Sequence, residues 1–189
     1  MDADPVQLHD RGAQLFASHV HAVPADGWLA PTPCTEWSVR DLVNHLVNEE
    51  LWVPELLAGR TIDEVGNRFD GDLLGDDPAA AWDDAAAAAQ DAIGELGAME
   101  RTVHLSFGDF SADFYAMQIF SDLLIHSWDL ARAIGGDDTL PADLMEACWD
   151  FNRPMADTLR ASGAFGDEVD VPEDADQQTK LLAFFGRAR

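Results

Sequence analysis

The sequence predicts an all-α protein, a four-helix bundle with one long crossover and short accessory helices near the C-terminus. Three observations support this fold class. Four long stretches carry apolar side chains at helical spacing, and residues that favour helix ends stand at their boundaries. A connection rich in Gly and Asp separates the second stretch from the third. Helices of this kind bury their apolar faces against one another, so a bundle is expected.

The composition is that of one folded domain covering residues 1–189. Hydrophobic residues make up 47% of the chain and aromatic residues 9%, which is enough apolar material for one substantial core. No internal repeat or Gly-Ser linker divides it. We therefore expect a single globular unit.

The first helix is predicted over residues 5–23. Leu8, Leu15 and Phe16 recur at helical spacing, and Pro5 suits a first turn, where its missing N–H is not needed. Three prolines and a glycine follow in residues 24–37, so this segment is predicted to be a loop.

The second helix is predicted over residues 38–58. Ser38 and Asp41 form a variant of the capping box, which satisfies the first free amides of a helix. Pro54 lacks the N–H that would bond to the preceding turn, so the last turns should kink or fray. Gly59 marks the expected end.

The third helix is predicted over residues 78–97, after a long connection at residues 60–77. Asp77 serves as the N-cap and Pro78 as the first helical residue, and the alanine-rich run that follows favours helix. Residues 101–111 alternate weakly about a Gly-Asp turn, which predicts a short hairpin or an extended crossing loop.

The fourth helix is predicted over residues 111–134 and is the longest and most apolar. Ser111 can cap its start, and Gly135 permits a left-handed residue at its end. A further helix is predicted from Pro141 to about Arg160. The segment DQQTKLLAFFGR has room for a last short one.

The charge balance excludes two classes of partner. The chain has 36 acidic against 11 basic residues, a formal net charge of -25, which repels nucleic acid and anionic membrane surfaces.

The N-terminal sequence MDADPVQLHD lacks the basic start and apolar run of a signal peptide, and no apolar run approaches ~20 residues. Two cysteines fit a reducing compartment. We therefore expect a cytoplasmic protein.

Asp122 and His126 stand four positions apart in FSDLLIHSWDLARAIG, and residues at this spacing share one face of a helix. They could bind one ion together, as paired ligands of helical zinc sites do. A solvent-facing pair is the alternative, and it is common at this spacing. The spacing alone leaves both interpretations open.

A third candidate ligand, His45, lies in an apolar run of the second helix. A lone histidine on such a face is more often a hydrogen-bonded core residue than a ligand. Two histidines and a carboxylate leave coordination positions for water or substrate, as catalytic zinc sites and two-histidine-one-carboxylate iron sites do. Together the three residues indicate an open metal site.

Three motifs in order, TPCTEWSVRDLVNHL, DLLIHSWDLARAIG and LLAFFGR, resemble the single-domain actinobacterial metal-binding proteins related to the N-terminal domain of mycothiol-dependent maleylpyruvate isomerase, within the DinB-like superfamily. The resemblance covers nearly the whole chain. It implies a DinB-like four-helix bundle whose metal ligands are His45, Asp122 and His126. The isomerase has glutamate where this chain has Asp122, and it has a C-terminal domain for which this chain has no room.

The resemblance and the ligand types together set the expected cofactors and partners. Zinc is expected first, with nickel, iron and manganese as alternatives, because histidine and carboxylate suit all four. Mycothiol is the expected cosubstrate on the resemblance alone. We expect a small-molecule thiol and an electrophilic substrate as partners, with no nucleic acid and no membrane, and a homodimer is left open.

Two acidic neighbours extend the predicted site as catalytic candidates. Glu49, one turn after His45, is either a fourth ligand or proton shuttle, or an exposed helix acid beside Glu50. Asp129 could hydrogen-bond a ligand imidazole, as outer carboxylates of metal sites do, or could form a cap or a salt bridge to Arg40 or Arg132.

Other polar residues carry weaker predictions. Tyr115 and Gln118 share the face of Asp122 and could line a pocket, although a core or surface role is the stronger expectation. Cys34 could be activated by nearby amides, but burial as a small apolar residue is favoured. The remaining histidines are predicted to be structural: His9, His19, His21 and His104.

The candidate ligands predict a divalent-metal-binding protein, and the resemblance implies that it acts as a thiol S-transferase or isomerase. Residues such as Trp52, Tyr115 and Trp128 are expected to wall its pocket. A metal-dependent hydrolase with Glu49 as base is the alternative within catalysis. A non-catalytic metal or small-ligand binding protein is the third, because fold does not fix function.

Overall fold

The computed structural model describes residues 4–162 and 166–188. In chain order the elements are α1 Pro5–Val20, α2 Val39–Leu57, α3 Ile62–Val65, α4 Pro78–Ile93, β1 Thr102–Leu105, β2 Gly108–Ser111, α5 Ala112–Ile134, α6 Ala142–Asn152, α7 Ala156–Ser162 and α8 Gln177–Phe184. Within these ranges, none of the helices combines the length and apolar character that a bilayer crossing requires.

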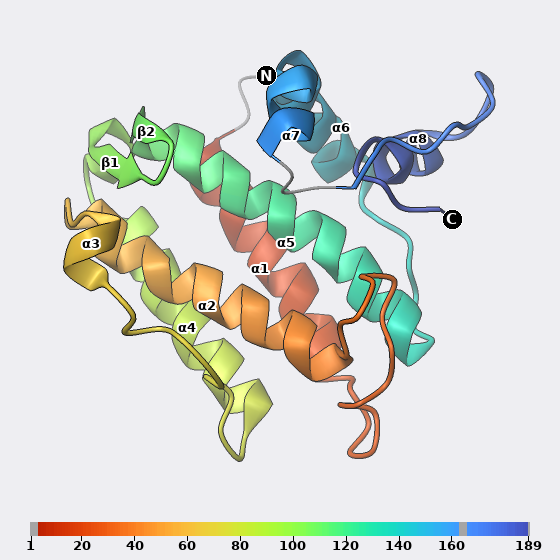
Figure 1. The fold of residues 1–189 in the computed structure, drawn as a ribbon, viewed down its shortest axis with the longest axis horizontal. Helices are drawn as coiled ribbons and strands as arrows, with labels where there is room; N and C mark the ends of the chain where they lie inside the picture. Colours follow the sequence, from red (N-terminus) through yellow and green to blue (C-terminus); the bar gives the residue numbers. More distant parts are fainter. Residues whose placement is uncertain (1–3, 163–165, 189) are drawn as a thin grey trace.

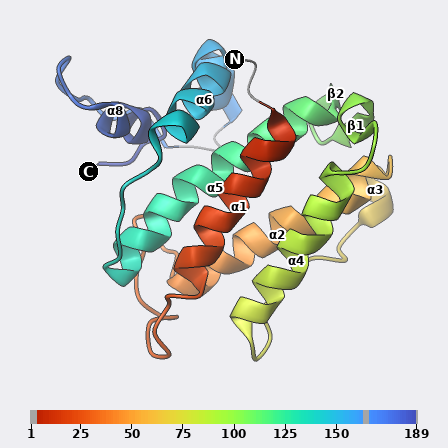
Figure 2. The same cartoon turned by 180° about the vertical axis from the view of Figure 1, so that it is seen from behind.

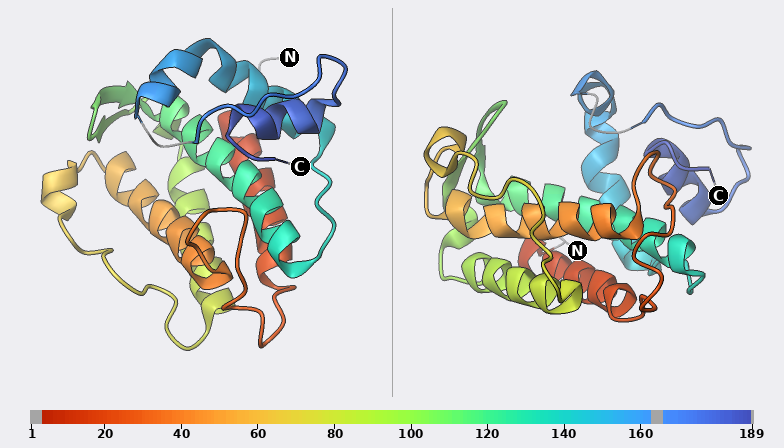
Figure 3. Two further views of the ribbon diagram at one scale, coloured as in Figure 1. Left: turned by 45° about the vertical axis from the view of Figure 1, so that its right-hand side comes forward. Right: turned by 60° about the horizontal axis from the view of Figure 1, so that its bottom comes forward.

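The long helices α1, α2, α4 and α5 form the predicted four-helix bundle (Figure 1). Seen from behind, α1 and α4 form one layer, and α2 and α5 form the other (Figure 2). Contacts join α1 to α5 and α2 to α4, so α1 and α2 lie on a diagonal (Figure 3). Helices α1 and α5 run one way and α2 and α4 the other, and the long connection between α2 and α4 is the expected crossover.

The chain folds into these helices for the local reasons that the sequence predicted. Ser38 and Asp41 form the capping box at the start of α2, and the Asp77 side chain accepts from the amide of Ala80 at 3.1 Å. Gly135 ends α5 in the left-handed region at φ 68°. Ser111 occupies the N-cap position of α5, but its side chain makes no capping bond.

The bundle packs around two apolar cores that share α5. The first fills the space among the four long helices, with Phe16, Leu46 and Trp82 fully buried. A glycine, Gly12, lets α1 approach α5 closely, because an added Cβ would lie 3.3 Å from Leu123 Cβ. The second core joins the outer face of α5 to α6 and α8. The accessory helices are therefore packed parts of the domain.

A buried polar pair crosses the centre of the first core. His9 Nε2 on α1 lies 3.1 Å from Glu50 Oε2 on α2, and both side chains are fully buried. Glu50, the acid next to Glu49 in the chain, is therefore a core residue, and His9 is structural as predicted. Since α1 and α2 are diagonal helices, this pair spans the bundle.

Several predicted element boundaries need correction. The helix expected from Pro141 to about Arg160 is two helices, because Pro154 has no N–H to continue the first and a 3₁₀ turn at Arg153–Met155 separates them. The connection at residues 60–77 contains the short helix α3. Helix α1 ends at Val20 instead of residue 23.

The remaining boundaries also differ by a few residues. Helix α4 ends at Ile93, before Gly94 and Gly97, instead of at residue 97. Helix α2 stays helical through Pro54 as far as Leu57. The predicted hairpin is present: β1 pairs antiparallel with β2, and the turn lies at residues 106–107, just before the predicted Gly-Asp.

Candidate metal centre

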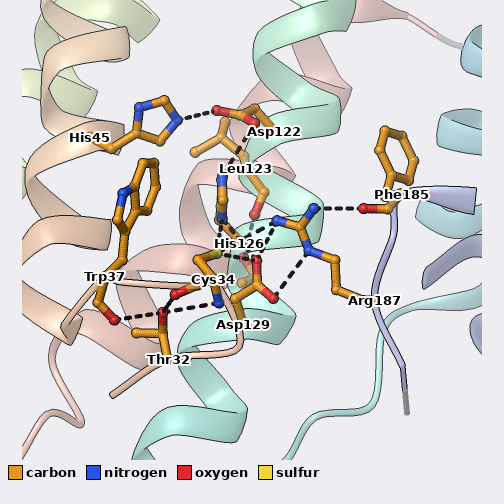
Figure 4. Close-up of polar contacts among 11 residues, drawn as sticks. Thr32, Cys34, Trp37, His45, Asp122, Leu123, His126, Asp129, Phe185 and Arg187 are labelled. Carbon is orange, nitrogen blue, oxygen red and sulfur yellow. Dashed lines mark hydrogen bonds and ion pairs between the residues drawn. The ribbon is translucent and has the colours of Figure 1, made fainter. Parts of the chain in front are cut away.

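The three predicted ligands converge between α2 and α5 (Figure 4). His45 Nε2 lies 2.9 Å from Asp122 Oδ2, and His126 Nε2 lies 3.4 Å from Oδ1 of the same carboxylate. One donor atom from each residue lies within 4.8 Å of the other two. The side chains are 28%, 18% and 7% exposed in that order, so the set reaches solvent mainly beside His45.

These distances fit a single divalent cation. Metal–ligand bonds of about 2.0–2.2 Å place neighbouring ligand atoms of a tetrahedral zinc site about 3.3 Å apart. The two contacts of Asp122 lie on either side of that value, so both imidazoles could share a cation with the carboxylate after small adjustments. The short aspartate side chain therefore reaches both imidazoles.

The electrostatics of Asp122 keep its carboxylate ionised. Burial by itself raises its pKa, but the charges of His126 and His45 and the hydrogen bond with His45 outweigh burial, and the pKa falls to about 2. A carboxylate must be ionised to bind a metal. Asp122 therefore has the protonation state that a ligand requires at neutral pH.

Asp129 fixes the orientation of the His126 ring from the opposite side. Its Oδ2 lies 2.9 Å from His126 Nδ1, and its side chain is fully buried. Because Asp129 accepts a hydrogen bond from Nδ1–H, the lone pair of Nε2 faces Asp122, which is how outer carboxylates prepare histidine ligands. The predicted contact of Asp129 with a ligand imidazole is present.

The cation that balances Asp129 comes from the far end of the chain. Arg187, just after α8, donates through Nη2 to Asp129 Oδ2 at 2.9 Å, and its side chain is 13% exposed. The predicted partners of Asp129 were wrong: Arg40 pairs with Asp72, and Arg132 pairs with Asp138. Arg187 ends the motif LLAFFGR, and the need of a buried carboxylate for a cation was the signal that could have identified it.

Cys34 joins the same cluster without being an activated thiol. Its Sγ donates to Asp129 Oδ2 at 3.2 Å. Burial, followed by the negative charge of Asp129, raises the pKa of the thiol to about 12. The weaker alternative, activation by nearby amides, is therefore wrong, and the favoured burial of Cys34 holds in part: the side chain is half-buried and its thiol donates a hydrogen bond.

A second group of possible ligands consists of Cys34, His126 and Asp129. It uses Nδ1 of His126, the nitrogen that faces away from Asp122. The guanidinium of Arg187 already contacts both Asp129 and Cys34 Sγ, the latter at 3.6 Å. A fixed positive charge at this position opposes a second cation, so the group containing Asp122 is the better metal site.

Trp37 covers the two imidazoles. Its ring lies 5.0 Å from that of His45 and 5.9 Å from that of His126, and it stacks on His126 at an interplanar angle of 27°. The turn that presents it is closed by a hydrogen bond from the Trp37 amide to the Cys34 carbonyl at 3.1 Å. In that turn Glu36 has a φ of 70°, in the left-handed region.

Glu49 lies beside the site on the face of α2 that carries His45. Its side chain is half-buried, so the interpretation as a simple exposed acid is wrong. Burial, followed by the negative charge of Asp122, raises its pKa to about 7. Its role as a ligand or proton shuttle remains a prediction.

The predicted aromatic wall is only partly placed near this centre. Tyr115 is buried, and the charges of Glu49 and Glu50 contribute to a raised pKa of its hydroxyl, after the larger effect of burial. Trp52 packs on Phe69. Trp128 lies in the second core, so its expected place in the wall is wrong.

The other polar candidates lie in ordinary surroundings. Gln118 is half-buried on α5. His21 contacts Asp83 at 2.9 Å, and His104 contacts Asp109 across the hairpin at 2.7 Å. These pairs are surface interactions, which agrees with the structural role expected for the two histidines.

Fold and site together define a helical-bundle protein with a histidine and carboxylate donor set suited to one divalent cation. Residues 9–131 match the family described as the mycothiol maleylpyruvate isomerase N-terminal domain. The chain belongs to this family, and the family predicted from the three motifs is confirmed. The bundle is the expected DinB-like fold.

Two relatives come from Mycobacterium tuberculosis, one from strain CDC 1551 and one from strain H37Rv. Each is 32% identical over 186 residues, which cover 97% of this chain and 98% of the relative. Both are described as uncharacterized proteins. No solved structure matches this chain.

Proposed function

We propose that the protein is a metal-dependent thiol S-transferase or isomerase, with zinc as the first metal to test and mycothiol as the thiol. The observation that carries this proposal is the convergence of His45, Asp122 and His126 on one point that is open to solvent on one side. Membership of the mycothiol maleylpyruvate isomerase N-terminal domain family supports the choice of thiol.

The residues of the site have distinct roles in this function. His45, Asp122 and His126 hold the cation, and Asp129 keeps a proton on Nδ1 of His126 so that Nε2 stays available. A bound divalent metal supplies Lewis acidity, which lowers the pKa of a thiol and keeps it as a nucleophilic thiolate. Trp37 limits the access of water to the imidazoles, since its ring lies against both.

Calorimetric titration of mycothiol into metal-loaded and metal-free protein tests this function. Mycothiol should bind more tightly to the loaded form, and the difference should vanish in His45→Ala. Glutathione and cysteine serve as comparison thiols. Equal affinity with and without metal for all three would overturn the thiol function.

Metal-assisted hydrolysis is the second candidate, and one observation favours it. The pKa of Glu49 is raised to about 7, first by burial and then by Asp122, and this value suits a general base at neutral pH. Turnover of an activated ester that is lost in Glu49→Gln, without any effect of thiols, would select this alternative. Ligand binding without turnover of any substrate would select a non-catalytic binding protein.

A further inference from the structure

Arg187, the arginine whose charge acts on Asp122, is paired with a carboxylate of the protein. Arg187 donates through Nε and Nη2 to the two oxygens of Asp129, at 3.4 Å and 2.9 Å, and through Nη1 to the Phe185 carbonyl at 2.7 Å. Each guanidinium nitrogen therefore has a partner within the protein. The charge of Arg187 is therefore already balanced by the buried carboxylate of Asp129.

The arginines on the helices that carry the site are also paired with carboxylates. Arg40 and Arg132, on the two helices that carry the site, are held by Asp72 and Asp138. The charged groups that act on Asp122 are His126, His45 and Arg187. Each arginine on α2 and α5, and the arginine whose charge acts on Asp122, is therefore paired with a carboxylate of the protein.

The open side of the site is instead bordered by a carboxylate. Glu49 follows His45, the most exposed of the three ligands, by one turn of α2, and its carboxylate interacts electrostatically with both Asp122 and His45. The whole chain adds a net charge of -25. A ligand uses one negative charge to bind the metal. If it carries a second negative charge, the carboxylate of Glu49 and the net charge of the protein repel it.

We propose that this site selects ligands with no second negative charge, namely an uncharged or cationic thiol and an uncharged electrophile, and that Glu49 determines this specificity. The inference rests on the proposed function, because it assumes a metal held by His45, Asp122 and His126. It goes further by naming the charge class of both substrates. Dicarboxylate electrophiles and acidic thiols are excluded by the same argument.

A matched pair of thiols tests the selection. Cobalt(II)-loaded protein is titrated at pH 8 with N-acetylcysteine amide and with N-acetylcysteine, which differ in an amide against a carboxylate, and binding is followed by the visible absorbance of the cobalt. The amide should bind on the order of tenfold more tightly, as expected for one nearby like charge. Raising the salt concentration should shrink this preference.

Variants assign the preference to one residue. Glu49→Gln should lower severalfold the ratio of the dissociation constant of N-acetylcysteine to that of N-acetylcysteine amide. Asp84→Asn is the matched control, because it removes one negative charge from an exposed position on α4 and should leave the ratio unchanged. The two probes differ in thiol pKa, but this difference is the same for every protein variant and cancels when the ratios are compared.

The outcomes separate this inference from the proposed function. Equal affinity for both thiols, or a ratio unchanged in Glu49→Gln, overturns the selection and leaves the thiol function standing. If neither thiol binds, the thiol function fails. The pair acetohydroxamate and succinate monohydroxamate then repeats the test without sulfur, and equal binding of those two overturns the selection.

Discussion

Arg187 and Asp129 lie 58 positions apart in the chain, and the guanidinium of one donates to the carboxylate of the other in the fold. Asp129 in turn contacts Nδ1 of His126, so the last residues of the chain support a predicted metal ligand. This relationship makes the segment after α8 part of the site, and it can be tested directly.

Arg187→Ala should weaken metal binding by roughly 10–100-fold, the usual effect of losing an outer partner of a metal ligand. The variant leaves Asp129 buried without its cation, so His126 loses its fixed orientation. Competition with a chromogenic chelator measures the affinity. Arg132→Ala removes a surface pair with Asp138 and a cation–π contact with Trp128, neither of which touches His126, and should bind metal normally. Unchanged affinity in Arg187→Ala would show that the segment after α8 is merely structural.

His126→Ala should lower the metal content of protein purified without an affinity tag. The reason is that His126 supplies the least exposed donor of the set and the link to Asp129. His21→Ala should keep the wild-type content, because its imidazole pairs with Asp83 on the surface. Elemental analysis measures the metal content of both variants. A similar loss of metal in His126→Ala and His21→Ala would argue against this site.

Ser38→Ala should lower the free energy of unfolding by about 1 kcal/mol. The Ser38 side chain accepts from the amide of Asp41 and closes the capping box at the start of α2. Urea denaturation followed by circular dichroism measures the change. Ser18→Ala, at an exposed bond to a carbonyl within α1, should change stability much less.

Glu36→Gly should raise the free energy of unfolding by roughly 0.5–1 kcal/mol, because glycine adopts a positive φ without the clash that other residues suffer. Glu36 has a φ of 70° in the turn that presents Trp37. Asp26→Gly, in the same long loop, lacks this gain and should be neutral or destabilising. A loss of stability in Glu36→Gly would mean that its side chain contributes more than the backbone strain costs.

Sequence reasoning identified the long helices because their signals are local. Ser38, Asp77 and Gly135 act on the backbone within a few residues of themselves, and apolar spacing needs only the helix in question. The break near Pro154 was missed because the apolar pattern continues across it.

The site was predictable only where its residues share a helix or belong to a motif. Asp122 and His126 are one turn apart, so their neighbourhood follows from helix geometry. The Asp129 contact with Arg187, by contrast, depends on how α8 packs on α5, which no local pattern encodes. The burial of Glu50 likewise depends on which face of α2 meets α1 across the bundle.

The buried pair of His9 and Glu50 constrains the assembly of the whole domain. Four apolar helices can be arranged around a common axis in several cyclic orders, and apolar contacts alone distinguish poorly among these orders. These two side chains meet across the centre of the bundle, and an arrangement that separates them leaves a carboxylate in an apolar interior without its partner, at a cost of about 3–5 kcal/mol. A single polar contact thus favours the arrangement in which α1 and α2 face each other across the bundle, and in that arrangement His45 on α2 lies beside Asp122 on α5.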